Sequence, residues 1–377
     1  METTELLRRQ IAFHQEEIIE DLKELVRCES PSIDKSLADV CGRKIDEIVK
    51  KRLGCDAEIY PAETRGDHRS FTIGEGEEQI LMLCHFDTVW EKGRLSLKQE
   101  GDLLYGPGVF DMKSGLVNAI WALKILKEQG LLPHKRFCLM CNSDEEVGSV
   151  SSRPVIEAKA RESAAALCIE PASGPQGFLK TARKGSGKYQ IEITGKAAHA
   201  GNNPQAGRSA VQEMALQTVY LHSLNDFEIG TTVNVGVANG GTRPNIIAER
   251  AHMEVDVRTW NDEEARRMDR LIFGLQPKTE GVSLKVTGGI ARPGMEATEK
   301  NLKLFDLAQS AARELGVSLD YIAAGGGSDG NFTSALGIAT LDGLGGKGDG
   351  AHAENEHIEI SGTMERLAVL ANFLTKL

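Results

Sequence analysis

The chain has 377 residues, of which 41% are hydrophobic and 26% are charged, and its formal net charge is -11. A chain of this length exceeds what one hydrophobic core usually covers, so two domains are expected. The acidic balance, without any run of lysine and arginine, argues against nucleic acid and anionic membranes as partners, and an anionic substrate would need a local cationic pocket.

The N-terminal segment is expected to form an amphipathic helix, because Leu6, Ile11, Ile18, Leu22 and Leu25 recur near helical spacing. It lacks the continuous apolar core of a signal peptide, and no segment approaches the ~20 apolar residues that a membrane span requires. The seven cysteines are odd in number and lie mostly in apolar runs, which is typical of reduced, buried thiols. These features predict a cytoplasmic protein.

Short apolar runs alternate with helical stretches between Glu78 and Pro171. The runs are ILMLC at 80–84, RFCLMC at 136–141 and AALCI at 165–169, and helices are expected near 113–128 and 152–160. Apolar strands that alternate with helices predict a three-layer α/β domain with a largely parallel sheet. Ligands of such sheets gather beyond the carboxyl ends of the strands.

The pattern changes between Lys184 and Arg292. Alternating strands are expected at 189–193, 231–237, 253–257 and 282–286, and helices at 209–224 and 261–275. The order β-α-β-β-α-β is that of the ferredoxin-like split motif. We therefore expect an α+β domain at 184–291, inserted into a larger domain formed by 1–183 and 292–377. The larger domain should end with helices at 301–315 and 363–377.

Potential metal ligands follow each of the three apolar runs. His85 and Asp87 follow the first, a series of acids ending in Glu145 and Glu146 follows the second, and Glu170 follows the third. Residues two apart share a face of an extended chain, so Asp87 can accept the second N–H of His85 and fix its tautomer. Crowded acids are costly unless cations offset their charge, so a buried cluster implies metal, whereas a solvated acidic loop is the alternative.

Two further candidates lie in glycine-rich segments. Asp111 follows a Gly-Pro-Gly turn just before an expected helix, where an N-cap is the alternative role. His352 ends a run that matches G-x-G-x-x-G by letter but opens no βαβ unit, so a ligand-presenting loop is preferred over a dinucleotide site. Each cluster alone has a structural alternative. Together, histidines and carboxylates without cysteine describe a site suited to zinc, with cobalt or manganese as substitutes.

These clusters resemble, in order and over nearly the whole chain, a family of dinuclear zinc peptidases. It includes glutamate carboxypeptidase, acetylornithine deacetylase, succinyl-diaminopimelate desuccinylase and aminoacylase. The segment TTVNVGVANGGTRPNIIAERAHMEVDVR at 231–258 is similar to the bacterial glutamate carboxypeptidase branch in particular. One departure is Ser114, where glycine is common, and it leaves the expected ligands untouched.

The resemblance implies two zinc ions per chain and a ligand set. Asp111 would bridge the two metals, with His85 and Glu170 completing one site and Glu146 and His352 completing the other.

The resemblance also implies roles outside the ligand set. Glu145 would be the general base, and His199 in the motif GKAAHAG would reach across a homodimer, formed through 184–291, to the partner's site. Asn245, Arg258 and Arg292 match polar positions associated with substrate or dimer contacts.

The implied activity is hydrolysis of a C-terminal peptide or acyl-amino-acid amide bond. The substrate would be a small peptide or N-acyl amino acid whose free carboxylate Arg292 binds, while His199 stabilises the oxyanion. One alternative is an N-acyl amino acid deacylase of the acetylornithine deacetylase or succinyl-diaminopimelate desuccinylase type. A non-catalytic homologue is another, and the presence of Glu145 with the whole ligand set argues against it.

Overall fold

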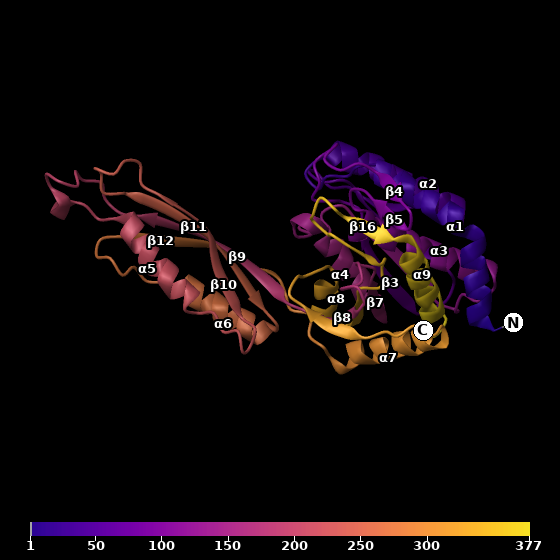
Figure 1. Ribbon diagram of the computed structural model, residues 1–377. Coiled ribbons are helices and arrows are strands. Elements are labelled where there is room, and N and C mark those ends of the chain that lie inside the picture. Colours follow the sequence, from indigo (N-terminus) through magenta and orange to yellow (C-terminus); the bar gives the residue numbers. More distant parts are fainter. Residues whose placement is uncertain (1) are drawn as a thin grey trace. The chain divides into compact units, whose positions relative to one another are not determined.

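The computed structural model describes residues 2–377, which separate into two compact units (Figure 1). Unit 1 comprises 2–182, Ala297–Ala323 and Ser328–Leu377, and unit 2 comprises Arg183–Glu296 with Ala324–Gly327. The inserted segment expected at 184–291 therefore lies within unit 2. No helix in the described part of the chain has both the length and the apolar content needed to cross a membrane.

Unit 1 is built on an eight-stranded sheet with the strand order β1-β2-β6-β3-β7-β14-β8-β13. Its four central strands pair in parallel and are β6 (Arg136–Asn142), β3 (Gln79–His85), β7 (Ala165–Cys168) and β14 (Ala339–Asp342). Antiparallel strands flank them, namely β1 (Glu58–Tyr60), β2 (His68–Ile73) and β8 (Leu179–Arg183), and β13 (Tyr321–Ala324) ends the sheet. The expected largely parallel sheet is confirmed.

Helices cover both faces of this sheet. One core joins α1 (Thr3–Arg27), α2 (Lys35–Leu53), α3 (Ser114–Glu128), α7 (Glu299–Glu314) and α9 (Ile360–Leu374), and another joins α4 (Arg153–Arg161) and α8 (Gly330–Ala335). Along β3, Ile80 and Met82 belong to the first core, whereas Leu81 and Leu83 belong to the second. Both faces of the strand are buried, which explains why the central strands are apolar throughout.

A small second sheet of unit 1 brings two glycine-rich segments together. Its strands, in order, are β15 (Gly348–Asp349), β16 (His357–Glu359), β5 (Leu103–Tyr105) and β4 (Lys98–Glu100). The antiparallel pairing of β16 with β5 places the loop that contains His352 beside the chain that leads to Asp111. The sequence did not predict this sheet, because strands of two or three residues carry too little alternation to be recognised.

Unit 2 contains an antiparallel sheet and two helices. The sheet has the order β10 (Thr232–Gly240), β11 (Arg250–Thr259), β9 (Gly185–Thr194) and β12 (Ser283–Arg292), and the helices are α5 (Ala210–His222) and α6 (Asp262–Phe273). On β9 the buried residues Tyr189, Ile191 and Ile193 alternate with exposed ones. Asn261 caps α6 by accepting the backbone N–H of Glu264 at 2.9 Å. The predicted order of strands and helices is confirmed.

All seven cysteines belong to unit 1 and are free thiols. Cys28 and Cys55 are partly exposed, whereas the other five are buried.

Candidate metal centre

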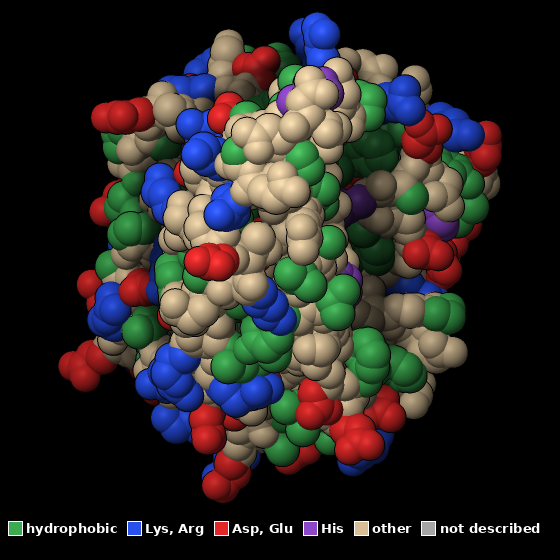
Figure 2. All heavy atoms as spheres, turned by 90° about the vertical axis from the view of Figure 1, so that its left-hand side faces the viewer, with side chains coloured by type: hydrophobic (Ala, Val, Ile, Leu, Met, Phe, Trp, Pro, Cys, Tyr) green, Lys and Arg blue, Asp and Glu red, His purple; other side chains and the backbone are tan. Residues whose placement is uncertain are grey.

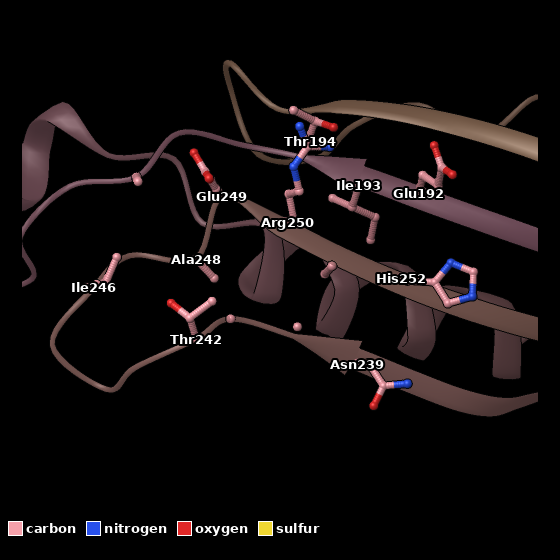
Figure 3. A pocket seen from close by; sticks show the side chains of 14 residues that line it. Glu192, Ile193, Thr194, Asn239, Thr242, Ile246, Ala248, Glu249, Arg250 and His252 are labelled. Carbon is pink, nitrogen blue, oxygen red and sulfur yellow. The ribbon is translucent and has the colours of Figure 1, made fainter.

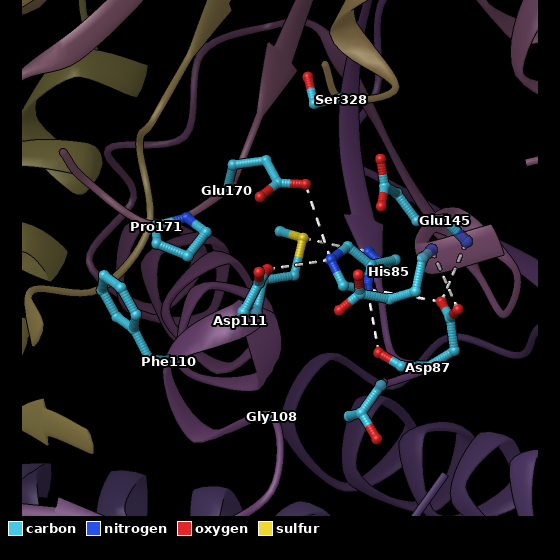
Figure 4. A network of polar contacts seen from close by, with 12 residues as sticks. His85, Asp87, Gly108, Phe110, Asp111, Glu145, Glu170, Pro171 and Ser328 are labelled. Atoms are coloured by element: carbon cyan, nitrogen blue, oxygen red, sulfur yellow. Dashed lines mark hydrogen bonds and ion pairs between the residues drawn. The ribbon is translucent and has the colours of Figure 1, made fainter. Parts of the chain in front are cut away.

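Several segments of unit 1 meet beyond the carboxyl ends of the central strands (Figure 4). His85 is the last residue of β3, Glu145 and Glu146 lie in a short helical turn after β6, and Glu170 follows β7. Because β6, β3 and β7 are parallel neighbours, these side chains emerge at one edge of the sheet. Asp111 reaches the same edge from the irregular turn Val109–Lys113 that leads into α3.

The buried imidazole of His85 faces two carboxylates. Its Nε2 lies 3.2 Å from Asp111 Oδ1 and 3.6 Å from Glu170 Oε1. The backbone N–H of His85 donates to the Met112 sulfur at 3.2 Å, which fixes the end of β3 against the turn that carries Asp111. Nε2 therefore points into the cluster of acids, and Nδ1 is left to a different partner.

That partner is Asp87, which is fully buried. His85 Nδ1 lies 3.1 Å from the Asp87 carbonyl oxygen and 3.4 Å from its Oδ1. The same carboxylate accepts hydrogen bonds from Ser32 Oγ at 2.7 Å and from the backbone N–H groups of Glu145 and Glu146 at 3.2 and 3.3 Å. Asp87 thus orients the imidazole and also fixes the backbone of both acids.

His352 faces the other oxygen of Asp111. Its Nε2 lies 3.4 Å from Asp111 Oδ2 and 3.0 Å from Glu146 Oε2. The residue has a left-handed backbone conformation, with φ of 62°, and its side chain is 54% exposed. Each carboxylate oxygen of Asp111 therefore faces one imidazole, so this residue would be placed between the two metal ions that the sequence predicts.

The electrostatics of the cluster favour cations. Burial raises the pKa of Glu146 to about 7. Burial alone would lower the pKa of His85, but its hydrogen bonds to Asp111 and Asp87 hold that pKa well above its usual value. Hydrogen bonds to Asp111 and Glu146 raise the pKa of His352 to about 10. The carboxylates thus attract positive charge strongly, and divalent cations would balance them in place of the imidazole protons.

Two groups of side chains bring ligand atoms within 4.8 Å of one another. One consists of His85, Asp111 and Glu146, and the other consists of His85, Glu145 and Glu170. Imidazole nitrogen and carboxylate oxygen suit zinc, cobalt and manganese, so the residues fit the metal that the sequence predicts.

The division of ligands between these groups differs from the one that the resemblance implies. Glu145, expected to be the base, lies as close to His85 and Glu170 as a ligand would. The geometry therefore admits two roles for Glu145, and these roles predict different metal contents when it is replaced.

The other predicted site residues belong to unit 2. His199 is exposed, and its Nδ1 accepts the backbone N–H groups of Gly201 and Asn202 at 3.1 and 3.0 Å, which leaves the ring proton on Nε2. His199 pairs with Ile246 in a β-bridge, and the backbone N–H of Ala200 donates to the carbonyl oxygen of Asn245 at 3.0 Å. His199 and Asn245 thus lie on adjacent segments of unit 2.

Basic residues gather around one end of β9. Arg258 on β11 and Arg292 on β12 are both in register with Ser186 of β9. Arg258 forms a two-pronged ion pair with Asp256, at 2.8 and 3.0 Å, and Arg292 is buried. Burial and the charge of Arg258 lower the pKa of Lys184. Arg258, Arg292 and Lys184 thus lie near the same end of β9, and binding of a substrate carboxylate by Arg292 stays a prediction.

A pocket of about 660 Å³ also opens on unit 2 (Figure 3). Residues of β9, β10 and β11 line it, together with the loop that contains Thr242, Ile246 and Ala248. None of the candidate metal ligands is among its lining residues. Its lining does include Ala197 and Ile246, from the two segments that pair around His199, so the pocket adjoins that histidine.

Sequence reasoning missed two residues that support the centre, Ser32 and Glu356. Ser32 donates to Asp87, and Glu356 accepts the backbone N–H of Asp111 at 3.1 Å. Glu356 is 1% exposed, whereas Glu354, two residues earlier, is exposed. Both are acids in the same short polar stretch, so no pattern of the sequence separates the buried one from the exposed one.

The fold and this centre are those of a metal-dependent hydrolase of amide bonds, and comparison with known proteins identifies the family. The chain belongs to peptidase family M20/M25/M40, whose sequence profile matches residues 81–376.

Relatives and solved structures agree with this assignment. The chain is 32% identical to carboxypeptidase G2 of Pseudomonas sp. (strain RS-16) over 311 residues, which are 81% of this chain and 75% of that protein. It is 30% identical to acetylornithine deacetylase of Proteus mirabilis (strain HI4320) over 227 residues, 55% of this chain and 57% of that one.

The fold is shared with the aminopeptidase PepT of Bacillus cereus, with a TM-score of 0.78 at 22% identity, covering 96% of this chain and 98% of that one. It is also shared with the YXEP protein of Bacillus subtilis, described as a dinuclear metal binding peptidase. For that protein the TM-score is 0.70 at 16% identity, and the match covers 97% of this chain and 98% of that one.

Proposed function

We propose that this protein is a dinuclear zinc exopeptidase that removes the C-terminal amino acid from a small peptide or acyl-amino-acid substrate. The observation that carries the proposal is the position of Asp111, with His85 at one carboxylate oxygen and His352 at the other. Glu170 and Glu146 complete the two halves of this arrangement. The 32% identity to carboxypeptidase G2 supports cleavage at the carboxyl end.

The residues of this chain divide the work of hydrolysis. When bound, the two metal ions would polarise the scissile carbonyl and lower the pKa of the attacking water. Glu145 accepts the proton of that water and passes it to the departing amine. Asp87 keeps His85 in the tautomer that presents Nε2, and it holds the Glu145 backbone through a 3.2 Å hydrogen bond.

Recognition of the substrate falls to unit 2 in this proposal. Arg292 binds the free carboxylate, because a guanidinium presents paired donors that match it, and Arg258 and Asn245 are further polar contacts. The outward Nε2–H of His199 stabilises the oxyanion that forms during attack.

A homodimer formed through 184–291 is part of the proposal, because the resemblance places His199 in the site of the partner chain. Unit 2 exposes apolar side chains on α5 and in the loop after it, namely Leu216, Val219, Phe227 and Ile229. Figure 2 shows the face that looks left in Figure 1, on which apolar side chains lie between charged groups of both signs. In this proposal the second copy covers the apolar side chains of α5 and of the loop after it.

The test is a release assay over three substrate groups: peptides with C-terminal glutamate, folyl-glutamates and N-acetylated amino acids. The proposal predicts release of the C-terminal residue, and it predicts that amidation of the substrate carboxylate abolishes useful hydrolysis. Equal rates on free-acid and amidated peptides would contradict an exopeptidase.

A second candidate is an N-acyl amino acid deacylase, which the 30% identity to acetylornithine deacetylase favours. Faster turnover of acetylated amino acids than of peptides in the same assay would establish it instead.

A further inference from the structure

Glu356 places a buried carboxylate against the turn that carries Asp111. Its side chain is 1% exposed. Oε1 accepts the backbone N–H groups of Phe110 at 3.0 Å and Asp111 at 3.1 Å. Oε2 accepts the backbone N–H of Gly108 at 3.0 Å and the indole N–H of Trp90 at 2.6 Å. Both oxygens of this carboxylate are therefore engaged by two donors each.

Glu356 also belongs to the loop that contains His352. Glu356 lies between His352 and β16, and β16 is paired with β5 just before the turn 106–113. Hydrogen bonds to a carboxylate are shorter and stronger than bonds between neutral groups. The carboxylate therefore fixes the distance between two loops whose side chains, Asp111 and His352, approach to 3.4 Å.

We propose that Glu356 is a positioning residue that sets the geometry of the bridging carboxylate and of His352, and thereby the affinity of the centre for zinc. This inference rests on the proposed metal site. Glu356 contacts the backbone of Asp111 and not its carboxylate, so its effect on metal binding acts through the position of that residue.

Replacement of Glu356 by glutamine keeps the size of the side chain but removes its charge and one of its two acceptor oxygens. In either orientation, the amide NH2 of Glu356→Gln faces two N–H donors, either those of Phe110 and Asp111 or those of Gly108 and Trp90. Two donors cannot hydrogen-bond to each other, so the turn must shift away on one side. We expect zinc affinity to fall by ~10- to 100-fold, the usual effect of losing a group that supports a metal ligand.

Glu354→Gln is the matched control. Glu354 lies in the same loop, is 67% exposed and pairs with Arg94 on the surface, so its replacement should leave zinc affinity unchanged. Glu356→Asp is the conservative variant. It keeps the charge and two acceptor oxygens on a side chain shorter by one methylene, so it should retain more affinity than Glu356→Gln.

Zinc dissociation constants are measured by chelator competition on purified metal-free protein, with melting curves and Trp fluorescence recorded on the same samples. A native melting curve with ~10- to 100-fold weaker zinc binding for Glu356→Gln, partial recovery in Glu356→Asp and no change in Glu354→Gln supports the proposal. Faster amide exchange at Phe110 and Asp111 in folded Glu356→Gln supports it independently.

Wild-type zinc affinity in folded Glu356→Gln would overturn the inference, as would equal losses in Glu356→Gln and Glu354→Gln. If Glu356→Gln fails to fold, Glu356→Asp decides: wild-type affinity in that folded variant overturns the inference, and weakened affinity supports it. If the wild-type protein binds no zinc, the proposed metal site itself is wrong. This outcome distinguishes a failure of the metal site from a failure of the inference about Glu356.

Discussion

Replacement of Glu145 by glutamine decides between the two roles that the structure admits for this residue. The substitution preserves size and leaves the backbone hydrogen bond from Glu145 to Asp87 in place, so the turn should stay where it is. It removes the ability to accept a proton at neutral pH. It also weakens any direct bond to a metal ion, because a neutral amide is a poorer ligand than a carboxylate.

The expected magnitude follows from the role. Loss of a general base lowers kcat by ~100- to 10,000-fold, which is about 3 to 5 kcal/mol in the activation barrier. The five expected ligands, His85, Asp111, Glu146, Glu170 and His352, are untouched, so the zinc content should remain at about two ions per chain.

The assay measures steady-state kinetics on a peptide with a C-terminal glutamate, with metal analysis of the same preparation. Glu146→Gln is the matched control, because Glu146 lies 3.0 Å from the His352 imidazole and its replacement should lower zinc content as well as activity. A Glu145→Gln enzyme that retains about half of the wild-type kcat would refute the assignment of the base. Loss of one zinc ion per chain would identify Glu145 as a ligand.

Further expectations concern metal, substrate and assembly. A chelator should abolish activity. Zinc affinity should increase with pH, because the carboxylates raise the pKa of His85 and raise that of His352 to about 10, so that zinc must displace a proton from each imidazole. Equal zinc affinities at pH 6 and pH 8 would contradict this. Arg292→Ala should lower kcat/KM for acidic and neutral C-terminal residues alike, and an effect confined to acidic ones would place Arg292 at the side chain of the substrate. Mixing Glu145→Gln and His199→Ala dimers should restore about a quarter of wild-type activity per site, because about half of the dimers are mixed and each mixed dimer has one intact site of its two. Confirmed subunit exchange without recovery of activity would show that His199 acts within its own chain or is not catalytic.

The regular parts of this fold were accessible from the sequence because their patterns are local. The apolar runs of β3, β6 and β7 reflect burial on both faces, and the alternation of β9 reflects burial on one face. The convergence of His85, Glu145 and Glu170 then follows from the parallel order of three strands.

The rest of the centre depends on contacts between distant segments. Glu356 and Asp111 are 245 residues apart in sequence, and Ser32 and Asp87 are 55 apart. The small sheet of β5 and β16 that aligns these loops has strands of three residues, too short to show a period. The sequence predicts the site residues that directly follow a recognisable strand. It contains no signal for residues such as Ser32 and Glu356, which only contacts between distant segments bring to the site.

The placement of the cysteines gives this two-unit chain a chemical reporter of unfolding. All seven thiols belong to unit 1, and burial raises the pKa of Cys84 and Cys141 in its central strands. Alkylating reagents attack the thiolate, so these sulfurs should react only when the sheet opens. The rate at which the five buried thiols are modified in the intact protein therefore measures the opening of unit 1 alone, since unit 2 contains no cysteine. If zinc binds only the folded centre, adding zinc should slow this modification in proportion to its occupancy.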